Sequence, residues 1–174
     1  MKEKLIRVAV YGTLMKGERN EHWGADARRR VPCTIRGVLY DTGWGFPAFV
    51  PDEHGRDVAA ELLDVTPETL ARLARLESYP RLYRRECVKA VPEGSAEAVA
   101  MVYVMNRLHL GASVIRCGEW RVFHRERDLW PARWPACCSE SSLEPRSDRR
   151  WAAWWTTPSS RNTGARDASR RLID

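Results

Sequence analysis

Two short stretches of the chain carry residue types suited to acid–base chemistry on a polar substrate. The first, Tyr11-Gly12-Thr13-Leu14, follows an apolar run at residues 5–10 and precedes a polar loop. A glycine directly after a buried strand lets the backbone turn sharply, and such a turn can aim several N–H groups at an anion or a polarised carbonyl. Taken alone, the tetrapeptide is more typical of a simple turn.

The second stretch contains Glu77, at the end of an expected helix. Its carboxylate shares one helix face with Leu70, Leu73 and Ala74, because these positions follow the spacing i, i+3, i+4 and i+7. Burial on that face and the negative end of the helix dipole both raise the pKa of a carboxyl, as proton transfer near neutral pH requires. The alternative is that Glu77 turns outward or pairs with one of three nearby arginines, Arg81, Arg84 or Arg85.

Strands account for most of the elements that must position these residues. Alternating or continuously apolar patterns predict strands at residues 5–10, 34–42, 48–50, 57–65, 83–92 and 96–106. Residues 57–65 are largely apolar on both faces apart from Glu61, which is typical of a central strand in a sheet or barrel.

The helix before Glu77 has clear start and stop signals. Thr66 can cap its first turn, and Pro67 suits its first position. Pro80 disfavours helical backbone at Tyr79, so the helix must end near that residue.

A second, shorter helix is expected at residues 20–30, before Pro32. Its end carries the charge run Arg28-Arg29-Arg30. A run of three arginines usually forms a solvated face, so we assign it no functional role.

The composition narrows the class of protein. A chain of 174 residues is long enough for one domain with its own core. No window approaches the roughly 18–20 apolar residues of a membrane helix, and no secretory signal sequence is recognisable, so we expect a cytoplasmic protein without a membrane partner. The five cysteines include no C-x-x-C pair and the four histidines lack metal-ligand spacing, which argues against a disulfide framework and a metal site.

The formal charge of +6 comes almost entirely from arginine, since only four lysines occur. A uniform preference for arginine over lysine is typical of GC-rich coding DNA, so the charge is a weak indication of a nucleic-acid partner.

The character of the chain changes after about residue 124. Residues 125–174 are rich in Arg, Ser and Pro, contain five of the eight tryptophans, and show no sustained helical or strand period. We therefore divide the chain into a folded domain at residues 1–124 and a tail at residues 125–174 that is expected to be disordered or loosely packed. Such a tail can bind single-stranded nucleic acid by charge and stacking, but we interpret it as an unselected extension.

Several short motifs occur in an order that resembles one family. They are Tyr11-Gly12-Thr13-Leu14 with Gly17 and Asn20, Gly45-Phe46-Pro47-Ala48, Leu76-Glu77-Ser78-Tyr79-Pro80 with Tyr83 and Arg85, and Val102-Tyr103-Val104. Together they resemble the gamma-glutamylcyclotransferase-like family, which includes gamma-glutamylamine cyclotransferases and small bacterial members. The resemblance covers residues 5–121, and Gly118-Glu119-Trp120-Arg121 resembles a common family ending.

The resemblance implies a fold, a reaction and a site. The fold would be α+β, a small mixed β-barrel flanked by short helices with a cavity at one end. The reaction would release 5-oxoproline and an amine from a small gamma-glutamyl substrate, without a metal, nucleotide or redox cofactor. Tyr11, Gly12, Thr13 and Leu14 would bind the substrate, Glu77 would be the general acid/base, and the Tyr83 hydroxyl would orient the substrate or Glu77, if it does not simply pack.

Two features depart from the family pattern. Ser78 stands where the family more often has glycine, and the tail has no recognisable counterpart. Both features leave room for a non-catalytic module that binds a small ligand on the same fold, and a nucleic-acid binder acting through the tail is a further alternative. The leaving amine and the oligomeric state are left open by the sequence.

Overall fold

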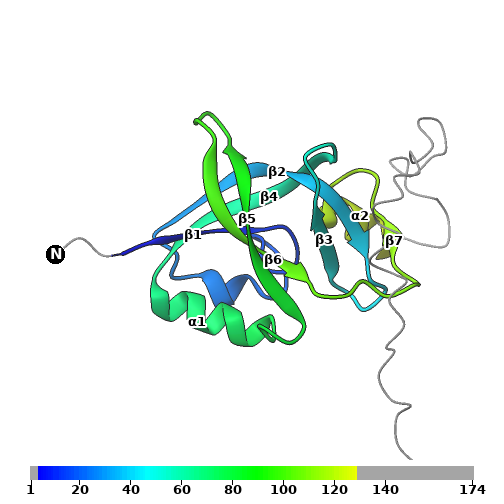
Figure 1. Cartoon of the computed structure of the whole chain (residues 1–174), viewed down its shortest axis with the longest axis horizontal. Coiled ribbons are helices and arrows are strands. Elements are labelled where there is room, and N and C mark those ends of the chain that lie inside the picture. The colour runs from blue at the N-terminus through cyan, green and yellow to red at the C-terminus, as the bar shows by residue number, and fades with distance from the viewer. Residues whose placement is uncertain (1–3, 129–174) are drawn as a thin grey trace, which may run out of the picture. The chain divides into compact units, whose positions relative to one another are not determined.

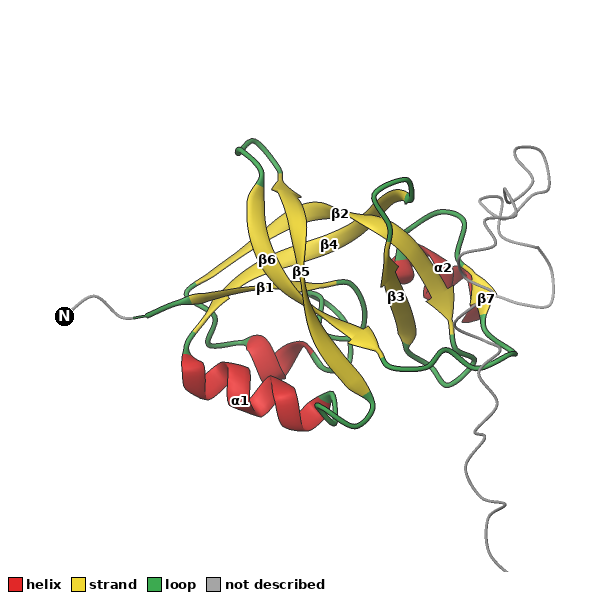
Figure 2. Cartoon of the chain, in the orientation of Figure 1, coloured by secondary structure: helices red, strands yellow, loops and turns green. Residues whose placement is uncertain are grey.

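The computed structural model describes residues 4–128 and contains seven strands, two α-helices and one 3₁₀-helix in that range (Figures 1 and 2). In chain order these are β1 (Ile6–Val10), the 3₁₀-helix η1 (Glu21–Gly24), β2 (Arg29–Asp41), β3 (Pro47–Pro51), β4 (Arg56–Val65), α1 (Pro67–Leu76), β5 (Tyr83–Pro92), β6 (Ala98–Met105), β7 (Ser113–Val114) and α2 (Trp120–Asp128).

Five of the strands close into a barrel. They pair in the order β2-β4-β1-β6-β5, and the ring closes where residues Cys33, Thr34 and Ile35 of β2 pair with β5. The β1–β6 pairing is parallel and the other pairings are antiparallel, so the barrel is mixed, as expected. Strands β3 and β7 pair with β2 outside the ring.

The central strands of the barrel are apolar and closely packed on both of their faces. Val8 and Ala9 of β1, Leu63 of β4 and Val102 of β6 expose 1% of their surface or less. Each fully buried aliphatic side chain of valine size or larger stabilises the fold by about 1.5–3 kcal/mol. Strand β1 is hydrogen-bonded to β4 on one side and to β6 on the other. The loop that follows β1 therefore starts from a fixed position in the barrel.

The prediction of a helix at residues 20–30 is wrong. Only Glu21–Gly24 forms a helix, a single 3₁₀ turn, and β2 already begins at Arg29. The register pairs Arg29 with Asp64 and continues through Pro32 and Glu61. Ladder hydrogen bonds to the long strand β4 therefore outweigh the local helical pattern.

Helix α1 has the expected start. The Thr66 hydroxyl accepts a hydrogen bond from the Thr69 amide at 3.2 Å, and Pro67 occupies the first helical position. Figure 2 shows α1 beside η1, and an ion pair joins Arg72 of α1 to Asp26, two residues after η1 ends.

Helix α2 extends the described structure to Asp128, four residues past the expected boundary at residue 124. The rest of the expected tail lies outside the described residues. Neither helix of the described range is long and apolar enough to cross a membrane.

Candidate active site

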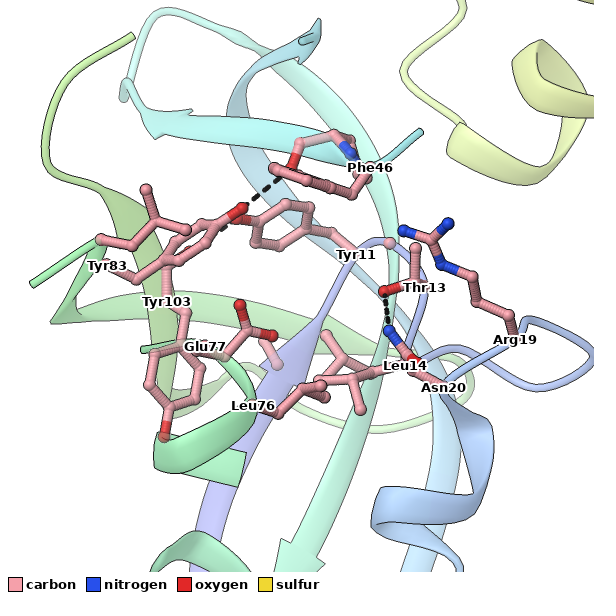
Figure 3. Close-up of a pocket in the computed structure, with 15 residues that line it drawn as sticks. Tyr11, Thr13, Leu14, Arg19, Asn20, Phe46, Leu76, Glu77, Tyr83 and Tyr103 are labelled. Atoms are coloured by element: carbon pink, nitrogen blue, oxygen red, sulfur yellow. Dashed lines mark hydrogen bonds between the residues drawn. The ribbon is translucent and has the colours of Figure 1, made fainter. Parts of the chain in front are cut away.

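A pocket opens where β1 ends, and it contains every residue that the sequence nominated for the site (Figure 3). Its walls come from β1 and the following loop, the start of β3, the end of α1, and strands β5 and β6. The lining residues are Ala9, Val10, Tyr11, Gly12, Thr13, Leu14, Arg19, Asn20, Phe46, Pro47, Leu76, Glu77, Leu82, Tyr83 and Tyr103.

Residues 11–14 form a turn, called here the 11–14 turn. The Met15 amide donates to the Gly12 carbonyl at 3.0 Å. Asn20 fixes the turn from outside, since its side-chain amide donates to the Thr13 hydroxyl at 3.0 Å and its backbone amide donates to the Thr13 carbonyl at 2.9 Å. The amides of Gly12, Thr13 and Leu14 donate to no group within residues 4–128. Three residues of the pocket lining therefore have backbone amides without an acceptor in the described part of the chain.

Glycine is required at position 12 because the Pro47 ring packs closely against the backbone there. A Cβ at this position would lie 2.6 Å from Cγ and 2.8 Å from Cδ of Pro47. The Pro47 ring is buried, so it has no room to withdraw. The two motifs that contain Gly12 and Pro47 thus form one wall of the pocket.

Glu77 is placed by the way α1 ends. It is the C-cap residue, and the two following residues close a Schellman motif: the Tyr79 amide donates to the Ala74 carbonyl at 2.9 Å and the Ser78 amide to the Arg75 carbonyl at 3.1 Å. Ser78 has a φ of 49°, in the left-handed region that favours glycine. The serine therefore occupies the one position of this motif where a glycine is preferred.

The Glu77 carboxyl has an unusual environment. Figure 3 shows it directed toward the rings of Tyr11 and Tyr83. Burial raises its pKa from 4.5 to about 7. It has no hydrogen-bond or ion-pair partner within residues 4–128.

The three arginines of the alternative interpretation do not reach Glu77. Arg84 pairs with Glu86 at 2.5 Å, and the Arg85 guanidinium donates to the Tyr103 hydroxyl at 3.1 Å. Arg81 makes no ion pair with a described residue. None of these three arginines therefore neutralises the Glu77 carboxylate.

The two tyrosines nominated for the site contribute neutral phenols. The Tyr11 hydroxyl donates to the Tyr103 carbonyl at 2.7 Å, and burial raises the pKa of Tyr11 well above its usual value. The Tyr83 hydroxyl donates to the Pro47 carbonyl at 3.4 Å, and burial followed by the charge of Glu77 raises the pKa of Tyr83. Tyr11 therefore offers its ring to the pocket, whereas the long Tyr83 contact can be exchanged for another acceptor.

A second buried carboxylate, missed as a site element by the sequence, anchors the far end of the loop. Glu61 accepts the Lys16 amide at 3.1 and 3.0 Å on its two oxygens, and ion pairs reach it from Arg30 at 2.6 Å and Arg121 at 3.3 Å. Arg30 also donates to the Leu14 carbonyl at 3.1 Å. The expectation that the Arg28-Arg29-Arg30 run has no role is therefore wrong for Arg30, because β2 turns its side chain toward the buried Glu61. An acid in the middle of the apolar run of residues 58–63 was the available signal.

Residues 8–122 match the family described as "Gamma-glutamyl cyclotransferase, AIG2-like". The chain is similar to the gamma-L-glutamyl-butirosin B gamma-glutamyl cyclotransferase of Niallia circulans, with 36% identity over 106 residues that cover 56% of this chain and 65% of that protein. It therefore spans slightly less than two thirds of that relative. It is also similar to the gamma-glutamylcyclotransferase family protein YtfP of Escherichia coli, with 31% identity over 66% of this chain and 96% of that protein.

Solved structures share the fold. YkqA from Bacillus subtilis matches with a TM-score of 0.58 and 20% identity over 73% of this chain and 44% of that one. An AIG2-like protein from Mus musculus matches with a TM-score of 0.53 and 22% identity over 60% of this chain and 79% of that one. At these identities the likeness concerns the fold alone.

Proposed function

The chain belongs to the AIG2-like gamma-glutamyl cyclotransferase family, and on that premise we propose that it converts a gamma-glutamyl compound into 5-oxoproline and a free amine. The observation that carries the proposal is the Glu77 carboxyl, which is unpaired within residues 4–128 and shares a pocket with three free backbone amides of the 11–14 turn.

The proposed reaction is an intramolecular aminolysis. The neutral α-amine of the glutamyl group attacks its own γ-carbonyl carbon, and the original amide C–N bond breaks as the five-membered lactam forms. The attacking nitrogen gives up one proton and the leaving nitrogen takes up one, so the step balances without a further reactant. Because nucleophile and carbonyl belong to one molecule, the substrate itself meets much of the entropic cost of bringing them together.

Glu77 is proposed as the general base and then the general acid. Its carboxylate would take the proton from the attacking nitrogen and return it to the leaving nitrogen. A pKa of about 7 suits both halves of this exchange, since the two protonation states are similarly populated at neutral pH. General acid–base catalysis of this kind contributes roughly 10²–10⁴ in rate.

The 11–14 turn is proposed as the oxyanion site. The tetrahedral intermediate carries a negative charge on the former carbonyl oxygen, and the amides of Gly12, Thr13 and Leu14 are donors without another acceptor in the described chain. One such donor stabilises a transition state by about 2.7–4 kcal/mol in comparable sites. Because Pro47 packs against Gly12 and Asn20 holds Thr13, these donors are already oriented before the substrate binds.

Tyr83 is proposed to orient the substrate or Glu77. Its hydroxyl is near enough for the Glu77 charge to raise its pKa, and its contact with the Pro47 carbonyl is long at 3.4 Å. No step in this scheme calls on a metal, nucleotide or redox cofactor. A chain with five cysteines and no recognisable disulfide pattern suits a reducing compartment, and we place the enzyme in the cytoplasm.

The test is a 5-oxoproline assay on a panel of gamma-glutamyl amino acids, amines and peptides. The wild type should release 5-oxoproline from at least one member, and Glu77→Gln should lower that rate by at least 100-fold with the fold intact by circular dichroism. Asp64→Asn is a matched control, because it neutralises a carboxylate whose 3.7 Å ion pair with Arg7 lies outside the pocket. Retained turnover in Glu77→Gln would remove Glu77 from the mechanism.

The same panel separates the enzyme from a ligand-binding module. A module would bind panel members, as measured by calorimetry, and would release 5-oxoproline from none of them.

A further inference from the structure

One part of the pocket rim is not used by the proposed chemistry. It consists of Trp44, Phe46 and Arg19, called here the rim cluster. Phe46 and Arg19 line the pocket. Trp44 continues outward from Phe46, with 6.0 Å between the ring centroids, and leaves 56% of its surface exposed.

The exposed Trp44 ring is held in place. It stacks on the His109 ring at a centroid distance of 4.5 Å. His109 is itself anchored, because Nε2 contacts the Thr42 carbonyl at 2.5 Å and Nδ1 accepts the Gly111 amide at 3.0 Å. An exposed indole normally samples several rotamers, and this one is held by the His109 stack while more than half of its surface stays exposed. The arrangement is a preformed surface on which a flat apolar group can stack.

Arg19 lies beside the same aromatic loop. A Cβ at Gly45 would lie 3.4 Å from Arg19 Nη1, so the guanidinium packs against the backbone between Trp44 and Phe46. Arg19 is exposed and makes no hydrogen bond or ion pair with a residue of the 4–128 range. Among the lining residues it is the one cationic side chain, since the pocket's tyrosines are neutral and Glu77 is acidic. An anionic group at the rim would find its natural partner here.

The rim cluster lies away from the reacting groups. Figure 3 places Arg19 on the far side of Thr13 from Glu77, and Phe46 across the pocket from Leu76. The rim cluster is therefore available to the part of a substrate that does not react, when the γ-carbonyl lies between Glu77 and the amides of the 11–14 turn as proposed.

We infer that the rim cluster is the subsite for the leaving amine, and that its preferred substrates are gamma-glutamyl amino acids with an aromatic side chain. The ring would stack on Trp44 and Phe46, and the carboxylate of the departing amino acid would pair with Arg19. Aromatic stacking contributes about 0.5–1.5 kcal/mol beyond area burial, which corresponds to a preference of roughly 3–10-fold. An exposed ion pair adds roughly 2–5-fold. This inference rests on the proposed function, because it assigns the leaving group of that reaction.

A grid of four substrates tests both contacts separately. These are gamma-glutamyl-phenylalanine, gamma-glutamyl-alanine and the C-terminal amide of each, so that ring and carboxylate vary independently. In the wild type, kcat/KM should be roughly 3–10-fold higher with the ring and 2–5-fold higher with the carboxylate. Trp44→Ala should lower the ring preference and leave the carboxylate preference unchanged, because Phe46 remains. Arg19→Gln should abolish the carboxylate preference and leave the ring preference unchanged.

Two exposed control positions match these variants. Leu110→Ala changes a residue in the loop of His109 that is 92% exposed and does not line the pocket. Arg36→Gln removes an exposed arginine of β2 that does not line the pocket either. Both should keep the wild-type preferences.

Three results would overturn the inference. The first is equal kcat/KM across the wild-type grid. The second is an equal loss on all four substrates in Trp44→Ala, which would mean that Trp44 only supports its loop. The third is an equal loss in Arg19→Gln, which would mean that Arg19 binds the common glutamyl end.

Failure of the proposed reaction can be distinguished from failure of the proposed subsite. If none of the four substrates yields 5-oxoproline, calorimetric binding of the same grid to Glu77→Gln still decides whether the ring and carboxylate are recognised. Preferences in binding would support the subsite without the reaction, and equal affinities would contradict the subsite.

Discussion

Glu61 and Glu77 are two carboxylates beside the same loop, and their surroundings are opposite. The Glu61 side chain exposes 6% of its surface and is bound by two arginines and the Lys16 amide. The partly buried Glu77 has no such partner within residues 4–128, and burial raises its pKa to about 7.

The difference shows that partners, more than burial, decide what a carboxylate can do. Paired and hydrogen-bonded, Glu61 ties the loop to β2 and α2. Unpaired, Glu77 can exchange a proton with a ligand near neutral pH. One residue type therefore serves as a structural anchor and, in our proposal, as the acid/base group.

The largest expected effect on stability comes from Glu61→Gln. Removing the charge leaves Arg30 without its carboxylate and leaves Arg121 with Glu119 alone, and breaking a buried pair in this way costs about 3–5 kcal/mol. Urea unfolding measures the loss. Asp64→Asn, which breaks the more exposed Arg7 contact, should cost less than about 1 kcal/mol. Equal losses in the two variants would remove the contrast between Glu61 and a surface acid.

Glu77→Gln should raise the free energy of unfolding, whereas Glu61→Gln lowers it. The folded-state pKa of Glu77 lies above its unfolded value, so the folded state binds more protons between pH 4.5 and about 7 and loses stability as pH rises through that range. Glutamine lacks this cost, and the variant should be more stable than the wild type by about 1–3 kcal/mol at pH 8.

The advantage of Glu77→Gln should vanish near pH 4. Unfolding curves of both proteins at pH 4 and pH 8 measure it. A variant that is less stable than the wild type at pH 8 would show that Glu77 has a stabilising partner.

A smaller effect is expected at Ser78, which completes the motif that aims Glu77 into the pocket. Left-handed backbone costs a non-glycine residue about 1–2 kcal/mol, and glycine gives back about 0.5–1 kcal/mol through the unfolded chain. Ser78→Gly should therefore raise the unfolding free energy by about 0.5–1 kcal/mol and leave the pKa of Glu77 unchanged. Ser78→Ala is the control and should bring no gain.

Local sequence patterns predicted the elements whose signals are local. Strand β5 was expected at residues 83–92 and is Tyr83–Pro92, and α1 begins after Thr66 as its capping residues require. The helix expected at residues 20–30 failed because β2 is paired with β4 from Arg29 onward, and a ladder across 35 residues of sequence leaves no trace in a local window.

The residues of the site also divide into those with a local sequence signal and those brought together only by the fold. Glu77 could be nominated because helical spacing placed it on the buried face, and the 11–14 turn because glycine follows a strand. The Glu61 cluster was missed because its partners lie 31 and 60 residues away, and only the closed barrel brings them together. The contact between Gly12 and Pro47 has the same origin.

The central claim is that Glu77 is a carboxyl able to transfer protons at neutral pH. Titration of its side-chain carboxyl by ¹³C NMR, with the signal assigned by its absence in Glu77→Gln, tests this most directly. We predict a midpoint near pH 7, in line with the effect of burial. A midpoint at or below 4.5 would contradict the account, because it would mean that a cation or hydrogen-bond donor holds the carboxylate charged.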